Sequence, residues 1–267
     1  MARRSANIEV MVRAVMKAAR GLARDFGEVE QLQVSRKGPA DFVSNADRRA
    51  EKILEDELKR ARPEFGLLLE ETGEKQGSQP QNRWIVDPLD GTTNFLHGLP
   101  HWAISVALEQ FGEITAAVIF DPIRDELFWA DKGSGAYLND RRLRVSARTA
   151  LSEALVGCGL PVRDWPGRAK GFTAQMNAMA DQVAGLRRLG TASLDLAWIA
   201  AGRQDAFWEY GLKPWDIGAG ILILREAGGR IGKLEGDEDL LAPGTIVAAN
   251  GALYPKMIEV LQAAGSG

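Results

Sequence analysis

Residues 87–94 read DPLDGTTN, and they follow directly on the apolar segment Trp84-Ile85-Val86. This pattern predicts a buried strand that ends at a turn, because Pro88 restricts the backbone there. Asp87 and Asp90 stand three residues apart across the proline, so the turn can direct both carboxylates to one point. The residues after Asp90 open a predicted short helix, whose first N–H groups lack intrahelical partners and attract anions. The stretch therefore predicts acids and free amides side by side at a strand end.

This stretch alone leaves two interpretations open. Carboxylates at Asp87 and Asp90, with the carbonyl of Leu89, form an all-oxygen set that suits a hard cation such as Mg²⁺. Aspartates near proline and glycine are also common in loops, where they merely cap a turn. Two further acids at element junctions favour the metal interpretation: Glu70 ends the preceding predicted strand, and Asp216 begins a predicted helix. An acid in the first turn of a helix is also an ordinary partner of the helix dipole.

Hydrophobic periodicity predicts the remaining elements. Helices are expected over 8–26, from 44–47 to the residue before Pro63, and over 166–183, 192–201, 215–227 and 254–264. Strands are expected over 65–69, 84–86, 103–108, 114–120, 126–129, 186–189, 205–208 and 245–248, with a turn at 37–40 and a polar loop over 73–82. An antiparallel first half followed by an alternating second half predicts an α/β (α+β) protein of two subdomains. Residues 1–145 would carry most of the metal ligands, and residues 146–267 would complete the site.

Composition excludes several classes of protein. The 267 residues include 33 Lys+Arg against 36 Asp+Glu, a net charge of −3, which argues against a nucleic-acid coat or a polybasic membrane binder. No secretory core and no long uncharged apolar run is present, so a cytoplasmic protein without a membrane partner is expected. The single cysteine, Cys158, excludes a disulfide scaffold. His97 and His101 are not expected to bind metal, because Gly98 and Pro100 between them break the helical face that such a pair needs.

Three motifs in order resemble the inositol monophosphatase family. They are the Glu-Glu pair at 70–71, residues 87–95 (DPLDGTTNF), and WDIGAG at 215–220 followed by EAGG at 226–229. The similarity covers about residues 11–250. It implies a layered αβαβα sandwich with an antiparallel-sheet N-terminal half. It also implies a Mg²⁺-dependent, commonly lithium-inhibited phosphomonoesterase that is usually a homodimer.

The resemblance also implies roles for individual residues. Two or three Mg²⁺ ions would be bound by Glu70, Asp87, Asp90, Asp216 and the Leu89 carbonyl. Catalysis would involve Asp47 and Thr92, which position or activate the attacking water, together with Glu70. The Gly91 and Thr92 amides would hold phosphate oxygens. Lys37 lies in the loop that closes over the metals in this family, although solvent exposure is the ordinary state of a loop lysine.

The implied substrate is myo-inositol monophosphate or a similar small polyol phosphate. Contacts to it are expected from Asp90, Gly91, Thr92, Ala192, Glu209 and Asp216. Glu209 would accept hydrogen bonds from substrate hydroxyls, unless it is only a surface residue after a strand. Histidinol phosphate, fructose 1,6-bisphosphate and 3′-phosphoadenosine 5′-phosphate are alternative substrates. A non-catalytic regulatory binding protein on the same fold is an alternative of another class, which complete metal acids disfavour.

Overall fold

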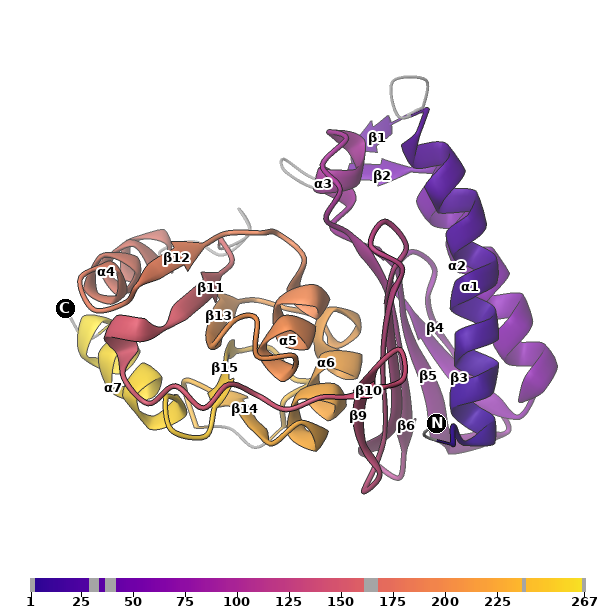
Figure 1. Cartoon of the computed structure of the whole chain (residues 1–267). Helices are drawn as coiled ribbons and strands as arrows, with labels where there is room; N and C mark the ends of the chain where they lie inside the picture. Colours follow the sequence, from indigo (N-terminus) through magenta and orange to yellow (C-terminus); the bar gives the residue numbers. More distant parts are fainter. Residues whose placement is uncertain (1–2, 29–33, 37–41, 161–167, 237–238, 266–267) are drawn as a thin grey trace.

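The computed structural model describes residues 3–28, 34–36, 42–160, 168–236 and 239–265, which build alternating layers of helix and sheet (Figure 1). The helices are α1 (Ala6–Phe26), α2 (Asn45–Ala61), α3 (Thr92–Leu96), α4 (Arg168–Ala180), α5 (Ala192–Ala200), α6 (Pro214–Glu226) and α7 (Tyr254–Gly265), with a 3₁₀ turn at Leu151–Glu153. The strands are β1 (Val34–Arg36), β2 (Phe42–Ser44), β3 (Phe65–Leu69), β4 (Gly73–Lys75), β5 (Gln79–Asp90), β6 (Ala103–Gln110), β7 (Glu113–Asp121), β8 (Glu126–Asp131), β9 (Gly135–Leu138), β10 (Arg141–Arg142), β11 (Leu155–Cys158), β12 (Gly185–Arg187), β13 (Ala206–Tyr210), β14 (Gly229–Lys233) and β15 (Thr245–Asn250).

The first sheet has the strand order β10-β9-β8-β7-β6-β5-β3-β4 and is covered on one face by α1 and α2 (Figure 1). Met11 and Leu22 on α1 recur on one side of the helix and lie in one buried core with Trp84 and Val86 of β5. Side chains alternate between the faces of a strand, so Ile85 points to the opposite face. The sheet is therefore apolar on both sides, and a second layer of helices must cover its other face.

Helices α5 and α6 form that layer, between the two sheets. Residues 217–224 of α6 are all buried, as expected for a helix enclosed on all sides. Ile85 of the first sheet and Phe207 of β13 belong to the same core as these helices. The second sheet has the order β12-β11-β13-β15-β14. Its opposite face packs on α4 and α7, which completes the αβαβα sandwich and confirms the expected fold class (Figure 1).

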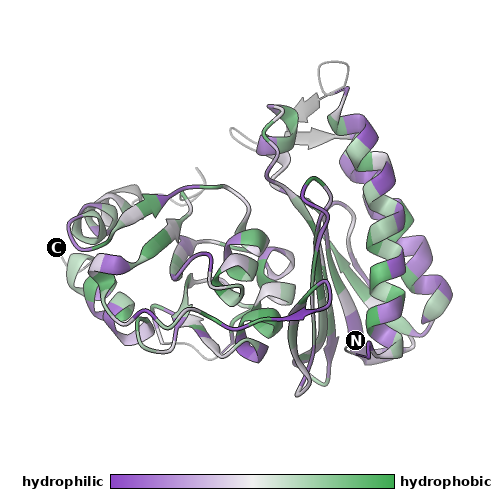
Figure 2. Cartoon of the chain, in the orientation of Figure 1, coloured by the Kyte–Doolittle hydropathy of each residue, from purple (hydrophilic) through white to green (hydrophobic). Residues whose placement is uncertain are grey.

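Hydropathy follows this layering (Figure 2). Along β15, Ile246 and Ala248 lie in the core of α5 and α6, whereas Val247 and Ala249 lie in the core of α4 and α7. Apolar residues therefore follow one another along central strands that are covered on both faces. Among the described residues, none of the helices has both the length and the apolar character needed to cross a membrane.

Several expectations about the elements were wrong. Residues 73–82 are not a loop: β4 pairs antiparallel with β3, and β5 already begins at Gln79, because backbone pairing needs no apolar side chains. The first sheet is not wholly antiparallel, since β3 and β5 run parallel. Residues 229–233 form β14, which no pattern indicated. The expected turn at 37–40, with Lys37, and the predicted helix start at Pro166 lie outside the described residues. The division near residue 145 stays a prediction.

Two glycines in helices provide a matched test of the packing between α5 and α6. A Cβ at Gly220 of α6 would lie 2.3 Å from Leu196 Cδ1 and 2.7 Å from Leu196 Cβ, whereas one at Gly21 of α1 would meet nothing within 4 Å. We expect Gly220→Ala to lower the free energy of unfolding by about 1–3 kcal/mol through overpacking. Gly21→Ala should raise it by about 0.5–1 kcal/mol, because alanine has the higher helix propensity. Urea unfolding measures both; equal signs would contradict the packing described.

Candidate active site

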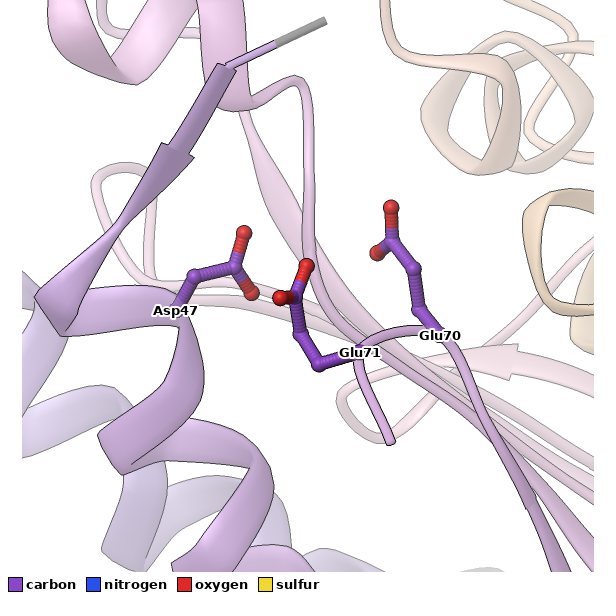
Figure 3. A group of neighbouring side chains, drawn as sticks. All are labelled: Asp47, Glu70 and Glu71. Carbon is purple, nitrogen blue, oxygen red and sulfur yellow. The ribbon is translucent and has the colours of Figure 1, made fainter. Parts of the chain in front are cut away.

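Three acids meet at the end of β3 (Figure 3). Asp47 lies in the first turn of α2 and is buried, and Glu70 and Glu71 follow β3 directly. One carboxylate oxygen from each of the three lies within 4.8 Å of the others, so the group can hold a metal ion. The hydroxyl of Thr92 lies beside it: Oγ1 donates to the Leu89 carbonyl at 2.9 Å and lies 3.4 Å from Asp47 Oδ2. Residues far apart in sequence thus surround one point.

Asp87 and Asp90 reach this point through a β-bulge, where a turn had been expected. Asp87 pairs with Ser105 and Asp90 with Ala103, so β5 holds one more residue than β6 between the two pairs. The Leu89 amide donates to Asp87 Oδ1 at 2.9 Å, which fixes that carboxylate inside the bulge. Pro88 fits here because a bulge releases one residue from the hydrogen-bonded ladder. The bulge keeps the two carboxylates close together, so that the charge of Asp90 contributes to raising the pKa of Asp87.

Residues from the second half of the chain complete the acid cluster. Asp216 is the third residue of α6, and its Oδ2 accepts from the Lys213 amide at 2.6 Å. The amide of Ser193, in the first turn of α5, donates to Asp90 Oδ2 at 2.7 Å. This bond ties the two halves together across 103 residues of sequence. The cluster therefore exists only when both halves are packed.

A pocket of about 350 Å³ opens over these acids. Of the residues expected at the site, it is lined by Glu70, Asp90, Gly91, Thr92, Ala192, Glu209 and Asp216. Asp47, Asp87 and Leu89 do not line it; all three are buried. Gly91 has φ +92°, and a Cβ there would lie 2.5 Å from Thr191 Oγ1, so only glycine lets the chain turn sharply at the pocket floor.

The electrostatics of the cluster fit a hard cation. Burial, followed by the charges of Glu70, Asp90, Asp216 and Asp47, raises the pKa of Asp87 well above its ordinary value. Burial also raises the pKa of Asp216 well above its ordinary value, and it raises the pKa of Asp90 to about 6 although the side chain and the amide of Ser193 oppose this. Carboxylates that destabilise one another in this way are stabilised by a divalent cation, and their oxygens are the ligands that Mg²⁺ prefers.

Sequence reasoning missed some residues of the site. Glu71 had no role assigned, yet it joins the three-acid group, where Arg48 Nε lies 3.7 Å from its Oε2. Its adjacency to Glu70 was the available signal. Arg188, which lines the pocket, was also missed. It stands in no pattern that indicates this contact, because the contact depends on how the halves pack.

His101 lies near the site but serves the packing. Its carbonyl accepts from Asn94 Nδ2 at 2.8 Å and Thr191 Oγ1 at 3.0 Å, and its ring meets Trp198 edge-on at 5.1 Å between centroids. Burial, together with Arg124 and against Asp121, lowers the pKa of the imidazole to about 4. Its expected lack of a metal role stays a prediction.

This shift predicts a specific acid sensitivity. A folded pKa near 4, below the unfolded 6.5, means that the folded protein binds fewer protons between these values. The stabilisation is complete above pH 6.5 and is lost as the pH falls toward 4. Between pH 7 and pH 5, protonation of His101 should lower the free energy of unfolding by about 2 kcal/mol. His101→Gln should abolish that part of the pH dependence. His97→Gln, the same substitution at an exposed site, is the control. Equal slopes for wild type and His101→Gln in urea unfolding would refute the assignment.

The comparisons with known proteins identify the family of the chain. The family model described as "Inositol monophosphatase family" matches residues 4–266. The inositol-1-monophosphatase of Rhizobium meliloti is 56% identical over 97% of both chains, and the Nus factor SuhB of Pseudomonas aeruginosa is 41% identical over 96% of this chain and 95% of its own. The crystal structure of extragenic suppressor protein suhB from Bartonella henselae aligns with a TM-score of 0.93 at 53% identity, over 97% of this chain and 99% of that one. The chain belongs to the inositol monophosphatase family.

Proposed function

We propose that the protein is a Mg²⁺-dependent phosphomonoesterase that hydrolyses inositol monophosphate or a similar small polyol phosphate. The observation that carries the proposal is the acid cluster beneath a pocket that also contains Glu209. A volume of about 350 Å³ lies at the small end of ligand pockets, which suits a phosphorylated ring better than a nucleotide bisphosphate. The relatives named inositol-1-monophosphatase support the same substrate class.

Each residue of the site has a proposed role that follows from its position. Glu70, Asp87, Asp90, Asp216 and the Leu89 carbonyl are proposed to hold two or three Mg²⁺ ions. Bound Mg²⁺ supplies a water of lowered pKa and offsets the charge of the phosphoryl and leaving oxygens. Asp47 and the Thr92 hydroxyl, 3.4 Å from Asp47 Oδ2, are proposed to orient or activate the attacking water together with Glu70. The Gly91 and Thr92 amides are proposed to bind phosphate oxygens, and Ala192 also lines the pocket.

Several properties rest on the family alone. Lithium sensitivity and a homodimer are proposed on that ground, whereas a cytoplasmic location is proposed from the sequence. Sedimentation at micromolar concentration tests the dimer, and phosphate release in the presence of LiCl tests the inhibition. A monomer in the sedimentation experiment would rule out the dimer, and an unchanged rate of phosphate release in LiCl would rule out the inhibition. Neither result would affect the phosphatase proposal.

The function is tested with a panel of phosphomonoesters. We expect the purified protein with Mg²⁺ to release phosphate from inositol 1-phosphate with a higher kcat/KM than from histidinol phosphate, fructose 1,6-bisphosphate or 3′-phosphoadenosine 5′-phosphate. EDTA should abolish the release. The enzyme proposal fails if no member of the panel is hydrolysed. If another ester has the highest kcat/KM, that ester replaces inositol monophosphate as the proposed substrate.

A second candidate function follows from the relative named Nus factor SuhB. A regulatory binding role would need the surface of the fold, whereas the acid cluster would be dispensable. If this role were the relevant one, a variant without a central carboxylate would complement the loss of the gene as well as wild type. The retention of the acids favours catalysis, because a binding surface gains nothing from buried carboxylates that destabilise one another.

A further inference from the structure

Gly159 and Glu209 lie side by side at the ends of two parallel strands. β11 and β13 are parallel neighbours in which Cys158 pairs with Trp208, and the Gly159 amide donates to the Trp208 carbonyl at 3.1 Å. Trp208 and Cys158 both face the core of α4 and α7. Because side chains alternate along strands, Glu209 and residue 159 share the other face, toward the pocket. Carboxyl ends of parallel strands are where open α/β sheets bind ligands.

No side chain fits at position 159 while Glu209 keeps its place. A Cβ there would lie 1.8 Å from Glu209 Cδ and 2.0 Å from each carboxylate oxygen. The backbone does not itself require glycine, because the φ angle of Gly159 is not positive. The carboxylate of Glu209 is therefore the physical reason for glycine at this position.

The same face of β11 carries a second glycine and a second acid. A Cβ at Gly157 would lie 2.0 Å from Gln204 Nε2 and 3.0 Å from Asp195 Oδ1. Asp195 raises the pKa of Glu209, after burial, and burial raises the pKa of Asp195 itself to about 8. The two glycines thus make room for a polar layer between β11 and α5. Glu209 is the member of this layer that lines the pocket.

We propose that Gly159 is the positioning residue for Glu209 and thereby sets the preference for polyol substrates. By having no side chain it lets the Glu209 carboxylate lie flat against β11, where it can accept hydrogen bonds from substrate hydroxyls. The identity of the substrate rests on the proposed function; the contact between the two residues does not. A Cβ at residue 159 moves the end of a flexible side chain and leaves the backbone in place. It therefore changes the position of the carboxylate more than the stability of the fold.

The test is a double-mutant cycle with two substrates. Gly159→Ala should lower kcat/KM for inositol 1-phosphate by about 10- to 100-fold, mainly through KM, because the hydrogen bonds between Glu209 and the substrate hydroxyls are lost. For p-nitrophenyl phosphate, which has no ring hydroxyls, the change should stay within about threefold. In a Glu209→Ala background, Gly159→Ala should have no further effect on either substrate. Gly171→Ala on α4 is the control, since a Cβ there meets nothing within 4 Å.

Two outcomes would overturn the proposal: equal losses for both substrates, or an undiminished loss in the Glu209→Ala background. If Gly159→Ala fails to fold, the double variant should fold, because the colliding carboxylate is gone; a double variant that also fails contradicts the inference. A crystal structure of Gly159→Ala provides a readout without activity and should show Glu209 in another rotamer. If wild type hydrolyses no ester, the proposed function fails, and the rotamer still decides the role of Gly159.

Discussion

Asp87→Asn should reduce kcat/KM for the phosphomonoester substrate by more than about 100-fold while making the metal-free protein more stable. Replacing a residue that only supports a metal ligand commonly costs 10- to 100-fold, and loss of a central carboxylate should exceed that. The stability gain follows from the same charge. Asp87 is 2% exposed, and burial, Glu70, Asp90, Asp216 and Asp47 all oppose its ionisation. Asparagine retains the oxygen that accepts from the Leu89 amide, so the bulge survives.

The two effects are measured separately. Phosphate release and calorimetric titration with Mg²⁺ should both show the loss, and urea unfolding in EDTA should show a gain of roughly 1 kcal/mol. Added Mg²⁺ should stabilise the wild type and the variant by different amounts, with the larger gain in wild type. Glu153→Gln is the control, since it removes one exposed carboxylate and should change neither quantity. Full turnover by Asp87→Asn would show that the metal assignment is wrong.

Asp205→Ala should lower the free energy of unfolding by about 1–3 kcal/mol, the cost of leaving hydrogen-bond donors without their buried acceptor. Asp205 is 1% exposed and precedes β13. Its carboxylate accepts from the Ser146 hydroxyl, from Arg148 Nη1 at 3.1 Å and from the Leu155 amide at 2.8 Å. Replacing Asp205 with alanine leaves these donors without their acceptor at the start of β11, in the sheet that carries Glu209.

Urea unfolding in EDTA measures this loss without any contribution from bound metal. Asp140→Ala, at the exposed turn between β9 and β10, is the matched control and should stay within about 0.5 kcal/mol of wild type. Asp205→Asn should lie between the two, because the amide retains one acceptor oxygen. A loss below about 1 kcal/mol for Asp205→Ala would mean that the network contributes little to the second sheet.

Local patterns predicted the elements where side chains decide them. The apolar spacing of α1 and the meander of β6, β7 and β8 were visible because each element has a continuous apolar face. β4 and β14 were missed, since an edge strand is formed by backbone hydrogen bonds that leave no hydropathy pattern. The bulge between Asp87 and Asp90 resembled a turn for a related reason: proline and glycine residues suit both, and only pairing with β6 distinguishes them.

The acids of the site were recognisable because each stands where a strand or helix begins or ends, and their order along the chain matched a family motif. Sequence by itself therefore determined which acidic side chains are candidate ligands, the class of fold and the near-neutral net charge. Only the tertiary structure decided that Glu71 joins Asp47 and Glu70, that Ser193 binds Asp90, and that Gly159 makes room for Glu209. The physical reason is distance along the chain. Contacts between residues this far apart in sequence are set by how whole layers pack, and no local pattern records that packing.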